Sequence, residues 1–500
     1  MVSELYSLIH SLSAVEKKTF ILSSKILDGD KDYLGLYEII LNNNYFSINN
    51  IKEAFLARYP KKSFQNNVSY LFKLITKTLI SIRISQDNWY KEMYGLMVAK
   101  LCVERSITDY ALKILRETDA SANENQNEIN SYLSRRFELD ILSDLNFKDT
   151  DEYSLVAKQM NLRNSINKIK HLHEQYSIYE LLKIRTLNDK TFTENSDKKN
   201  IQDLILSEIA IISATNKDVF VSQKLHYMFQ SFFLTHNNDD NAAIKGFFKL
   251  IELFDNNPKK WNNPPYDYLS VLDEILNILS YSGKYHEMLF YINKLNQLIE
   301  KDYPKHFENE VKKSIKLYEL IMHIGTNQYN LILDNINYYK PSHTLHINNK
   351  KDSEIILWNC ILYYSLKKWS MVKKLSSTFV IYEHDKQLER VGRLFYIISM
   401  YELRDLDLID YNIRAFKRTY KNLPKLFPIE NIIFTLILSD IKSRGNNYKA
   451  ELYSKIENKL ITEESSNSET FKYLLKYFDF TVWVRQQFES SKNNSLKLQP

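Results

Sequence analysis

Glycine and proline are scarce in this chain, and the scarcity narrows the folds open to it. Gly occurs 8 times and Pro 9 times in 500 residues, where average usage would give roughly 35 and 25. Sheets with tight turns, dinucleotide-binding crossovers and proline-rich linkers all need more of both residues. The composition therefore predicts an all-α chain of helices joined by short polar turns.

The length of the chain favours a stack over one compact core. Single cores stop growing near about 250 to 300 residues, so 500 residues must form several domains or a stack that adds core unit by unit. No Gly/Ser-rich or Pro-rich stretch separates one half of the sequence from the other. We therefore expect one continuous helical array.

Helix signals are clear near the N-terminus. In the sequence SAVE, Ser13 and Glu16 match a capping box, in which each side chain bonds the backbone N–H of the other residue. A longer helix is predicted from Ser63, with its apolar residues at helical spacing. This helix could be taken for the DNA-reading helix of a helix-turn-helix, but its apolar face suits a core. We therefore favour a helical cap over residues 1–84.

Four segments superpose without gaps and predict a repeat. Each combines a helix of aromatic and aliphatic residues with a short polar turn and an apolar residue that opens the next helix. The segments start at Ile278, Leu320, Ile361 and Ile398, which are 42, 41 and 37 residues apart. Such intervals fit helix hairpins stacked side by side. We expect a right-handed, tetratricopeptide-like solenoid of antiparallel hairpins over 85–489, followed by a disordered tail at 490–500.

Two glycines share an offset in these segments, at the point where a helix ends. They are Gly283 and Gly325. Glycine at the end of a helix commonly adopts a left-handed conformation that caps the last turn. We therefore predict a positive φ at both.

The hairpins resemble degenerate tetratricopeptide units, although most consensus positions are missing and the period is longer. The whole chain also resembles a large family of uncharacterised bacterial helical-repeat proteins. The resemblance lies in the segments LSAVEKKTF, NVSYLFKLITKTLISI and GRLFYIISMYELRDLDLIDYNIRAFKRTY. It implies a helical-repeat fold and no particular reaction. Because the tetratricopeptide relatives mostly bind other proteins, it also implies a protein partner.

Motifs of the common enzyme classes are missing from the sequence. The glycines closest to phosphate-loop spacing, Gly29 and Gly35, are followed by Leu36 where the loop needs Lys and then Ser or Thr. No Gly-x-Ser-x-Gly elbow occurs. Cys102 and Cys360 lie on apolar faces without a basic neighbour, which favours core thiols over nucleophiles. We therefore expect no catalysis and no cofactor.

Metal ligands are not predicted either. His171 and His173 would point to different faces of one helix, and neither has a Cys or carboxylate at ligand spacing. His343 and His346 fall in a polar loop and also have no Cys or carboxylate at ligand spacing. We interpret all four as surface or capping histidines and expect no metal site.

One local concentration of basic residues occurs near the C-terminus. In YNIRAFKRTYK the basic residues stand at offsets 0, 3, 4 and 7, so a helix would carry them as one stripe. If 385–403 and 405–422 form a hairpin about Arg404, two arginines of the first helix come level with the second. The candidate residues for an anionic partner are Arg390, Arg393, Arg414, Lys417, Arg418 and Lys421. The alternative is a solvated helix face, because bases near a helix C-terminus also match the macrodipole.

Charge and cysteine content indicate the cellular compartment and the classes of partner that suit this protein. Lys and Arg number 67 and Asp and Glu number 61, which gives a net charge of +6. Over a chain of this length, that net charge is too small to indicate nucleic-acid or membrane binding by itself. Two cysteines fit a reducing compartment. No signal peptide or long apolar segment is recognisable. We expect a soluble cytoplasmic protein without membrane insertion.

These expectations combine into a functional hypothesis. The chain is expected to be a non-catalytic scaffold, adaptor or regulator that uses its solenoid surface for protein–protein interaction. The alternative is a nucleic-acid-binding repeat protein that uses the basic cluster near residues 390–421, with Tyr411 and Tyr420 as stacking groups. The sequence predicts neither the identity of the partner nor the oligomeric state.

Overall fold

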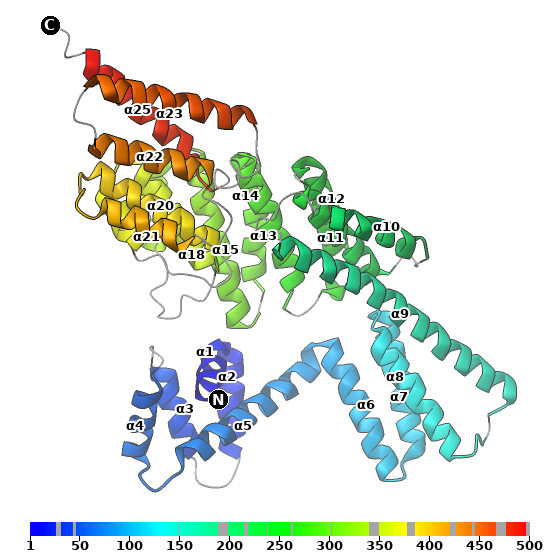
Figure 1. Ribbon diagram of the computed structural model, residues 1–500. Helices are drawn as coiled ribbons and strands as arrows, with labels where there is room; N and C mark the ends of the chain where they lie inside the picture. Colours follow the sequence, from blue (N-terminus) through cyan, green and yellow to red (C-terminus); the bar gives the residue numbers. More distant parts are fainter. Residues whose placement is uncertain are drawn as a thin grey trace. The chain divides into compact units, whose positions relative to one another are not determined.

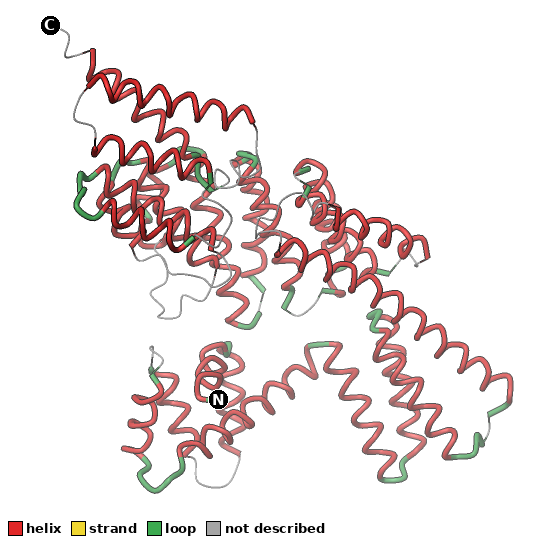
Figure 2. The backbone as a smooth tube through the Cα atoms, in the orientation of Figure 1, coloured by secondary structure: helices red, strands yellow, loops and turns green. Residues whose placement is uncertain are grey.

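The computed structural model describes most of the chain, and all of its described regular structure is helical (Figure 2). The all-α prediction is confirmed for this part of the chain. The residues outside the description are 27–31, 44–46, 149, 189–198, 215–218, 238, 262–263, 302, 340–349, 378–385, 421–426, 443–445, 467–476 and 497–500.

The chain divides into two compact units. Figure 1 labels the helices that make them up. Unit 1 contains Met1–Asn188, Asn195–Leu272 and Leu298–Glu310, and unit 2 contains Asp273–Gln297 and Val311–Pro500. The predicted boundaries at residues 84, 489 and 490 stay predictions.

Unit 1 begins with five helices around a core of their own. They are α1 (Val2–Ser11), α2 (Ala14–Ile26), α3 (Asp32–Asn42), α4 (Ile48–Arg58) and α5 (Phe64–Gln86). The capping box forms as predicted, since the Ser13 N–H donates to Glu16 Oε2 at 2.9 Å and the Glu16 N–H donates to Ser13 Oγ at 3.2 Å. On α5, Val68, Leu71 and Ile75 are fully buried against this core. The apolar face of α5 therefore supports the bundle, as the apolar spacing predicts.

The remaining helices of unit 1 pack in chain order. They are α6 (Asn88–Glu104), α7 (Thr108–Glu124), α8 (Glu128–Asp144), α9 (Glu152–Asn188), α10 (Lys199–Ala214), α11 (Phe220–His236), α12 (Asp240–Asn256) and the 3₁₀ turn η1 (Pro258–Lys260). Each of α6 to α9 contacts the next helix, and α6 also contacts α8. Contacts to the next helix and to the one after it are typical of a stacked helical repeat.

The boundaries between the two units fall within three helices, and the helices that follow these three in the chain belong to unit 2. The first group is α13 (Tyr266–Tyr281), α14 (Tyr285–Ile299) and α15 (Lys305–Gly325). The second is α16 (Tyr329–Asp334), α17 (Ile336–Tyr339), α18 (Lys350–Ser365), α19 (Trp369–Ser377), α20 (Lys386–Glu402), α21 (Ile409–Thr419), α22 (Pro428–Lys442), α23 (Asn446–Ser466) and α25 (Phe480–Leu496). Helices α18 to α21 contact one another in order, and α18 also contacts α20. The packing is compatible with a solenoid, and its handedness stays a prediction.

One kind of tight turn joins many neighbouring helices. A residue with positive φ follows the last residues of the first helix. The N–H of the next residue donates to the carbonyl oxygen five residues before it, which caps that helix. The positive-φ residues of these turns are Ser106, Gln126, Asn146 with Phe147, Gly283, Asn327, Lys367 and Arg404. Most are not glycine, which explains how so many turns form in a chain with few glycines.

The glycine prediction is half right. Gly283 has φ of +70°, as expected. The prediction for Gly325 is wrong, because Gly325 is the last residue of α15 and Asn327, two residues later, takes the left-handed conformation with φ of 58°. The four segments therefore reach their turns at slightly different offsets, which a gapless superposition conceals.

Candidate functional site

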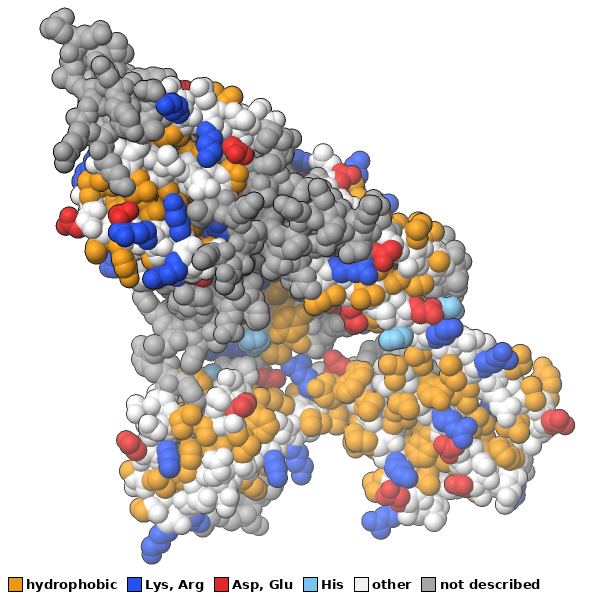
Figure 3. Space-filling view, viewed as in Figure 1, with side chains coloured by type: hydrophobic (Ala, Val, Ile, Leu, Met, Phe, Trp, Pro, Cys, Tyr) orange, Lys and Arg blue, Asp and Glu red, His pale blue; other side chains and the backbone are white. Residues whose placement is uncertain are grey.

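The hairpin of α20 and α21 turns at Arg404, as predicted. Arg404 has φ of 58°, its N–H donates to the Tyr401 carbonyl at 3.0 Å, and the Asp405 N–H donates to the Met400 carbonyl at 3.0 Å. Figure 3 shows Lys and Arg side chains gathered over this hairpin. The hairpin therefore presents a basic surface, but its individual residues have different surroundings.

Arg390 lies in the core of unit 2 and not on the surface. Its guanidinium donates from Nε and Nη2 to both carboxylate oxygens of Glu430 on α22. The guanidinium carbon is 4.2 Å from the ring centroid of Phe427 and 4.9 Å from that of Tyr420. Arg390 is 3% exposed and Glu430 is fully buried. The expectation that Arg390 converges with the exposed bases is therefore wrong, because α22 covers it.

The buried pair perturbs the carboxyl group. Burial raises the pKa of Glu430, and the ion pair with Arg390 opposes that rise. The Phe427 N–H also donates to Glu430 Oε2 at 3.0 Å and adds a hydrogen bond to the charged form. All polar atoms of the Glu430 carboxylate are thus engaged by the fold, so this pair is a structural feature.

Arg393, one turn after Arg390, reaches a groove between α19, α20 and α21. The groove has a volume of about 310 Å³. Its lining residues are Ser376 and Ser377 of α19, Glu389, Arg393, Tyr396 and Ile397 of α20, and Asn412, Ala415 and Phe416 of α21. Arg393 and Ala415, which the hairpin pairing about Arg404 puts level, both line it. The groove lining is therefore compatible with the geometry expected for these two residues.

The groove exposes a helix that is otherwise enclosed. Between Leu388 and Tyr401 of α20, Arg393 and Tyr396 are the two side chains that are not buried. Arg393 donates from Nε to Oε1 of the buried Glu389 at 2.7 Å and is 37% exposed. Its guanidinium therefore reaches the groove while one of its edges is held in place.

The predicted stripe on α21 lies away from the floor of the groove. Arg414 is 74% exposed and pairs with Asp410 four residues earlier. The Lys417 ammonium lies 5.8 Å from the ring centroid of Phe434 on α22. Arg418 is exposed one turn after Ala415, so it lies on the same side of α21 as that lining residue. Lys421 lies outside the described residues.

The structure thus separates the five candidate residues that it describes. It places Arg390 in the core, Arg393 in the groove, and Arg414, Lys417 and Arg418 at exposed positions of α21. Sequence reasoning missed the other side of the groove, Ser376 and Ser377, because the packing of α19 against α20 leaves no local signal. The exposure of Tyr396 within an apolar helix was missed for the same reason.

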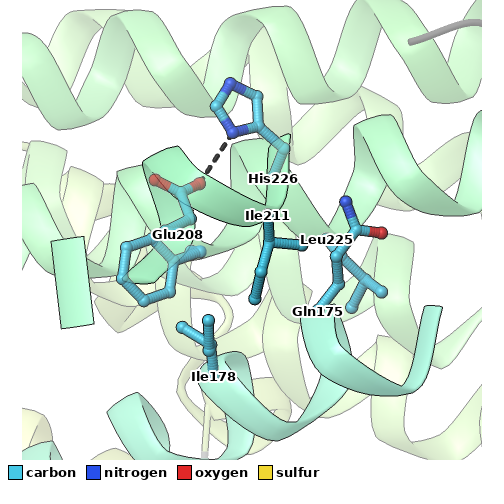
Figure 4. Close-up of a pocket in the computed structure, with 7 residues that line it drawn as sticks. Gln175, Ile178, Glu208, Ile211, Leu225 and His226 are labelled. Carbon is cyan, nitrogen blue, oxygen red and sulfur yellow. Dashed lines mark hydrogen bonds and ion pairs between the residues drawn. The ribbon is translucent and has the colours of Figure 1, made fainter. Parts of the chain in front are cut away.

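A second hollow, between α9, α10 and α11, is too small for a ligand (Figure 4). Its volume is about 10 Å³, roughly the space of one water molecule. His226 Nδ1 lies 2.7 Å from Glu208 Oε1, and Gln175 Nε2 donates to Ser222 Oγ at 2.8 Å. These bonds tie the three helices together, and we interpret the hollow as part of the core.

The groups considered for metal and nucleophilic chemistry are dispersed. In the described ranges no three His, Cys, Asp or Glu side chains are arranged to hold a metal ion. His171 lies 3.3 Å from Glu174 on the same helix, and His343 and His346 fall outside the description. Cys102 and Cys360 are buried, and burial raises the pKa of the Cys360 thiol. That thiol is therefore held in its protonated form.

The described helices include none with the length and apolar character needed to cross a membrane. Comparison with family models, curated protein sequences and solved structures finds no match to this chain. Any function must therefore be inferred from the geometry of the chain itself.

Proposed function

We propose that the chain is a non-catalytic scaffold or adaptor protein, and that the groove between α19, α20 and α21 is a site where it binds a partner protein. The observation that carries this proposal is the exposure of Arg393 and Tyr396 from the otherwise buried 388–401 segment of α20. Tyr and Arg are enriched among the residues that dominate binding energy at protein interfaces.

The chemistry of the groove favours binding over catalysis. The Ser376 hydroxyl donates to the Val372 carbonyl at 2.7 Å, and the Ser377 hydroxyl donates to the Lys374 carbonyl at 2.8 Å. Each hydroxyl proton is therefore engaged by the backbone and not by a base, as activation of a nucleophile would need. Arg393 and Glu389 pair with each other. The arrangement offers hydrogen bonds and apolar contact area but no acid–base pair.

A nucleic-acid partner is the second candidate, and the outer face of α21 favours it. Tyr411 is 61% exposed on the same helix as the exposed Arg414 and Arg418. An exposed aromatic ring among bases is an arrangement that stacks on unpaired nucleotides. Tyr420, the other expected stacking group, is buried, however. The groove is therefore the better supported site.

A cytoplasmic location completes the proposal. Both cysteines, Cys102 and Cys360, are unbridged and buried, which suits a reducing compartment. The helical packing is also compatible with a tetratricopeptide-like repeat, the architecture that the resemblance implies.

A groove-filling substitution tests the proposal. Ala415→Trp would place an indole in the groove without changing charge, and Ala120→Trp, at an exposed position of α7, is the matched control. The three proteins are used as bait in native lysate with and without nuclease. We expect wild type and the control to capture a protein partner both with and without nuclease. Ala415→Trp should fail to capture it. Equal capture by all three baits would contradict the proposed site.

A further inference from the structure

We infer that the groove receives an acidic side chain of the partner, next to an apolar one, and that Arg393 is the residue that binds the carboxylate. This inference rests on the proposed function and specifies the chemistry of the partner. It concerns an extended protein segment that carries Asp or Glu beside an apolar residue.

The first argument is the contrast between two arginines one turn apart on α20. Arg390 uses Nε and Nη2 on Glu430, and aromatic rings surround its guanidinium. Arg393 donates from Nε to Glu389, and its guanidinium carbon lies 5.9 Å from the ring centroid of Tyr420. Within the described residues its Nη atoms form no hydrogen bond. A guanidinium held along one edge presents the remaining N–H groups in a fixed direction, which suits bidentate recognition of a carboxylate.

Other polar groups lie around the same site. Asn412 directs its amide nitrogen to the Leu408 carbonyl at 2.8 Å, so its side chain is fixed beside the groove. The Tyr396 side chain is half-buried one turn after Arg393 and supplies a hydroxyl that can donate to a carboxylate oxygen. Fixed donors reduce the conformational entropy that binding would otherwise cost.

The rest of the lining is apolar. Ile397 and Phe416 are buried, and the small side chain of Ala415 leaves room above them. An aliphatic side chain of the partner can fill this space while its acidic neighbour reaches Arg393. The lining therefore predicts an acidic residue adjacent to an apolar one, and not a purely acidic segment.

The charges around the groove are complementary to an acidic segment. Lys374 of α19 and Arg418 of α21 are both exposed, and neither has an acidic partner within ion-pair distance in the described part of the chain. Three acids of α20, α21 and the turn between them are engaged in ion pairs: Glu389 pairs with Arg393, Asp405 with Lys373 and Asp410 with Arg414. The positive charges of Lys374 and Arg418 would steer an acidic segment toward these helices.

The same arrangement disfavours a nucleic-acid backbone inside the groove. Successive phosphates need a row of cations, whereas the groove contains one guanidinium with the Glu389 carboxylate beside it. Of the described bases of the α21 stripe, none lines the groove, and Arg418 follows the lining residue Ala415 by one turn. A single carboxylate is the better match to one half-engaged guanidinium.

Peptide selection tests the inference directly. A phage-displayed random peptide library is selected on the full-length wild-type chain at low salt, with Ala415→Trp as the counter-selection bait. We expect the recovered peptides to be enriched in Asp or Glu next to an apolar residue. A labelled peptide from this set should bind wild type in a salt-sensitive manner and should not be displaced by single-stranded oligothymidine.

The decisive variant removes both charges of the ion pair. Arg393→Met alone would leave the Glu389 carboxylate buried without its partner, so Arg393→Met is combined with Glu389→Gln. The double variant should lose at least about tenfold in affinity for the labelled peptide, with its circular dichroism unchanged. If instead it binds as wild type does, or if the selected peptides lack acidic residues, the acidic chemistry is wrong although the groove remains the site.

Two further outcomes would reject the groove as the binding site or the protein nature of the partner. Equal recovery of peptides on wild type and on Ala415→Trp would show that the groove is not the binding site, so the proposed function would lose its support as well. Displacement of the peptide by oligothymidine would overturn the inference in favour of a nucleic-acid partner.

Discussion

A Cβ atom added to Gly325 would stand 2.4 Å from the ring of Tyr285, because α15 ends where it meets the first residue of α14. Gly283 differs, since an added Cβ would meet nothing within 4 Å. The first glycine is thus required by a close approach and the second by its positive φ. Both lie in the repeat region, but for unrelated physical reasons.

We predict that Gly325→Ala destabilises the chain by about 1 to 3 kcal/mol, because the ring of Tyr285 must move out of its packed position. Adding Tyr285→Ala should remove the clash, so the double variant should lose less than the sum of the two single variants. Urea unfolding followed by circular dichroism measures both. Additive losses would show that the two residues do not meet.

Gly283→Val should destabilise by about 1 to 2 kcal/mol, for a backbone reason alone, since a β-branched residue strongly disfavours φ of +70°. Gly283→Asn is the control, because Asn tolerates the left-handed conformation. It should cost much less. Thermal unfolding that is the same for the Val and Asn variants would contradict a left-handed turn at this position.

The opposite substitution should stabilise a turn. Lys367 has φ of 55° and is exposed, so Lys367→Gly should relieve left-handed strain and raise stability by about 0.5 to 1 kcal/mol. Lys368→Gly, at the next position, lacks this benefit and should be neutral or destabilising. Hydrogen exchange of the amides in α18 and α19 reports the local effect. Equal protection in both variants would argue against strain at Lys367.

The buried ion pair predicts a pH-dependent defect. Arg390→Met leaves the buried carboxylate of Glu430 without its partner and should cost about 3 to 5 kcal/mol near neutral pH. Replacing both residues, Arg390→Met with Glu430→Leu, should recover much of the loss. Chemical unfolding of the wild type and of both variants at one pH measures these differences.

The sign of the pH effect follows from the pKa. Burial raises the pKa of Glu430, and removal of Arg390 removes the charge that opposes this rise. The folded single variant then binds a proton more readily than the unfolded chain, so its stability falls as pH rises through the folded pKa. Acidification should therefore shrink the defect of Arg390→Met relative to the double variant. A defect that grows on acidification would contradict this assignment.

The extent to which sequence predicts this protein depends on how local each feature is. The capping box at Ser13 and Glu16 and the hairpin turn at Arg404 depend on residues close in sequence, and both predictions are confirmed. The position of Arg390 depends on Glu430, 40 residues away on another helix. No helical periodicity indicates that distant partner, so the sequence groups Arg390 with the exposed bases.

The groove also shows how far the sequence predicts a site that several helices form together. Arg393 was predicted as a site residue because hairpin geometry alone brings it level with Ala415. The contribution of α19 could not be foreseen, since Ser376 and Ser377 carry no signal until the helix packs beside α20. A stripe at helical spacing identifies a face, but it does not show which neighbour covers that face.

The last prediction separates the groove from the stripe. Arg414→Gln with Lys417→Gln removes two exposed charges of α21 and leaves the groove and Arg418 unchanged. Because Gln is a good helix former, folding should survive with a loss of only about 0.3 to 1 kcal/mol for each charge near the helix terminus. If the groove is the binding site, this variant should keep its partner at nearly wild-type affinity, whereas Glu389→Gln with Arg393→Met should lose it.

A nucleic-acid site on the stripe predicts the opposite result, in which Arg414→Gln with Lys417→Gln weakens binding and Glu389→Gln with Arg393→Met does not. It also predicts a log–log salt slope that falls by roughly one for each phosphate contact removed. Titration of both double variants against the same labelled peptide and oligothymidine decides between the two surfaces.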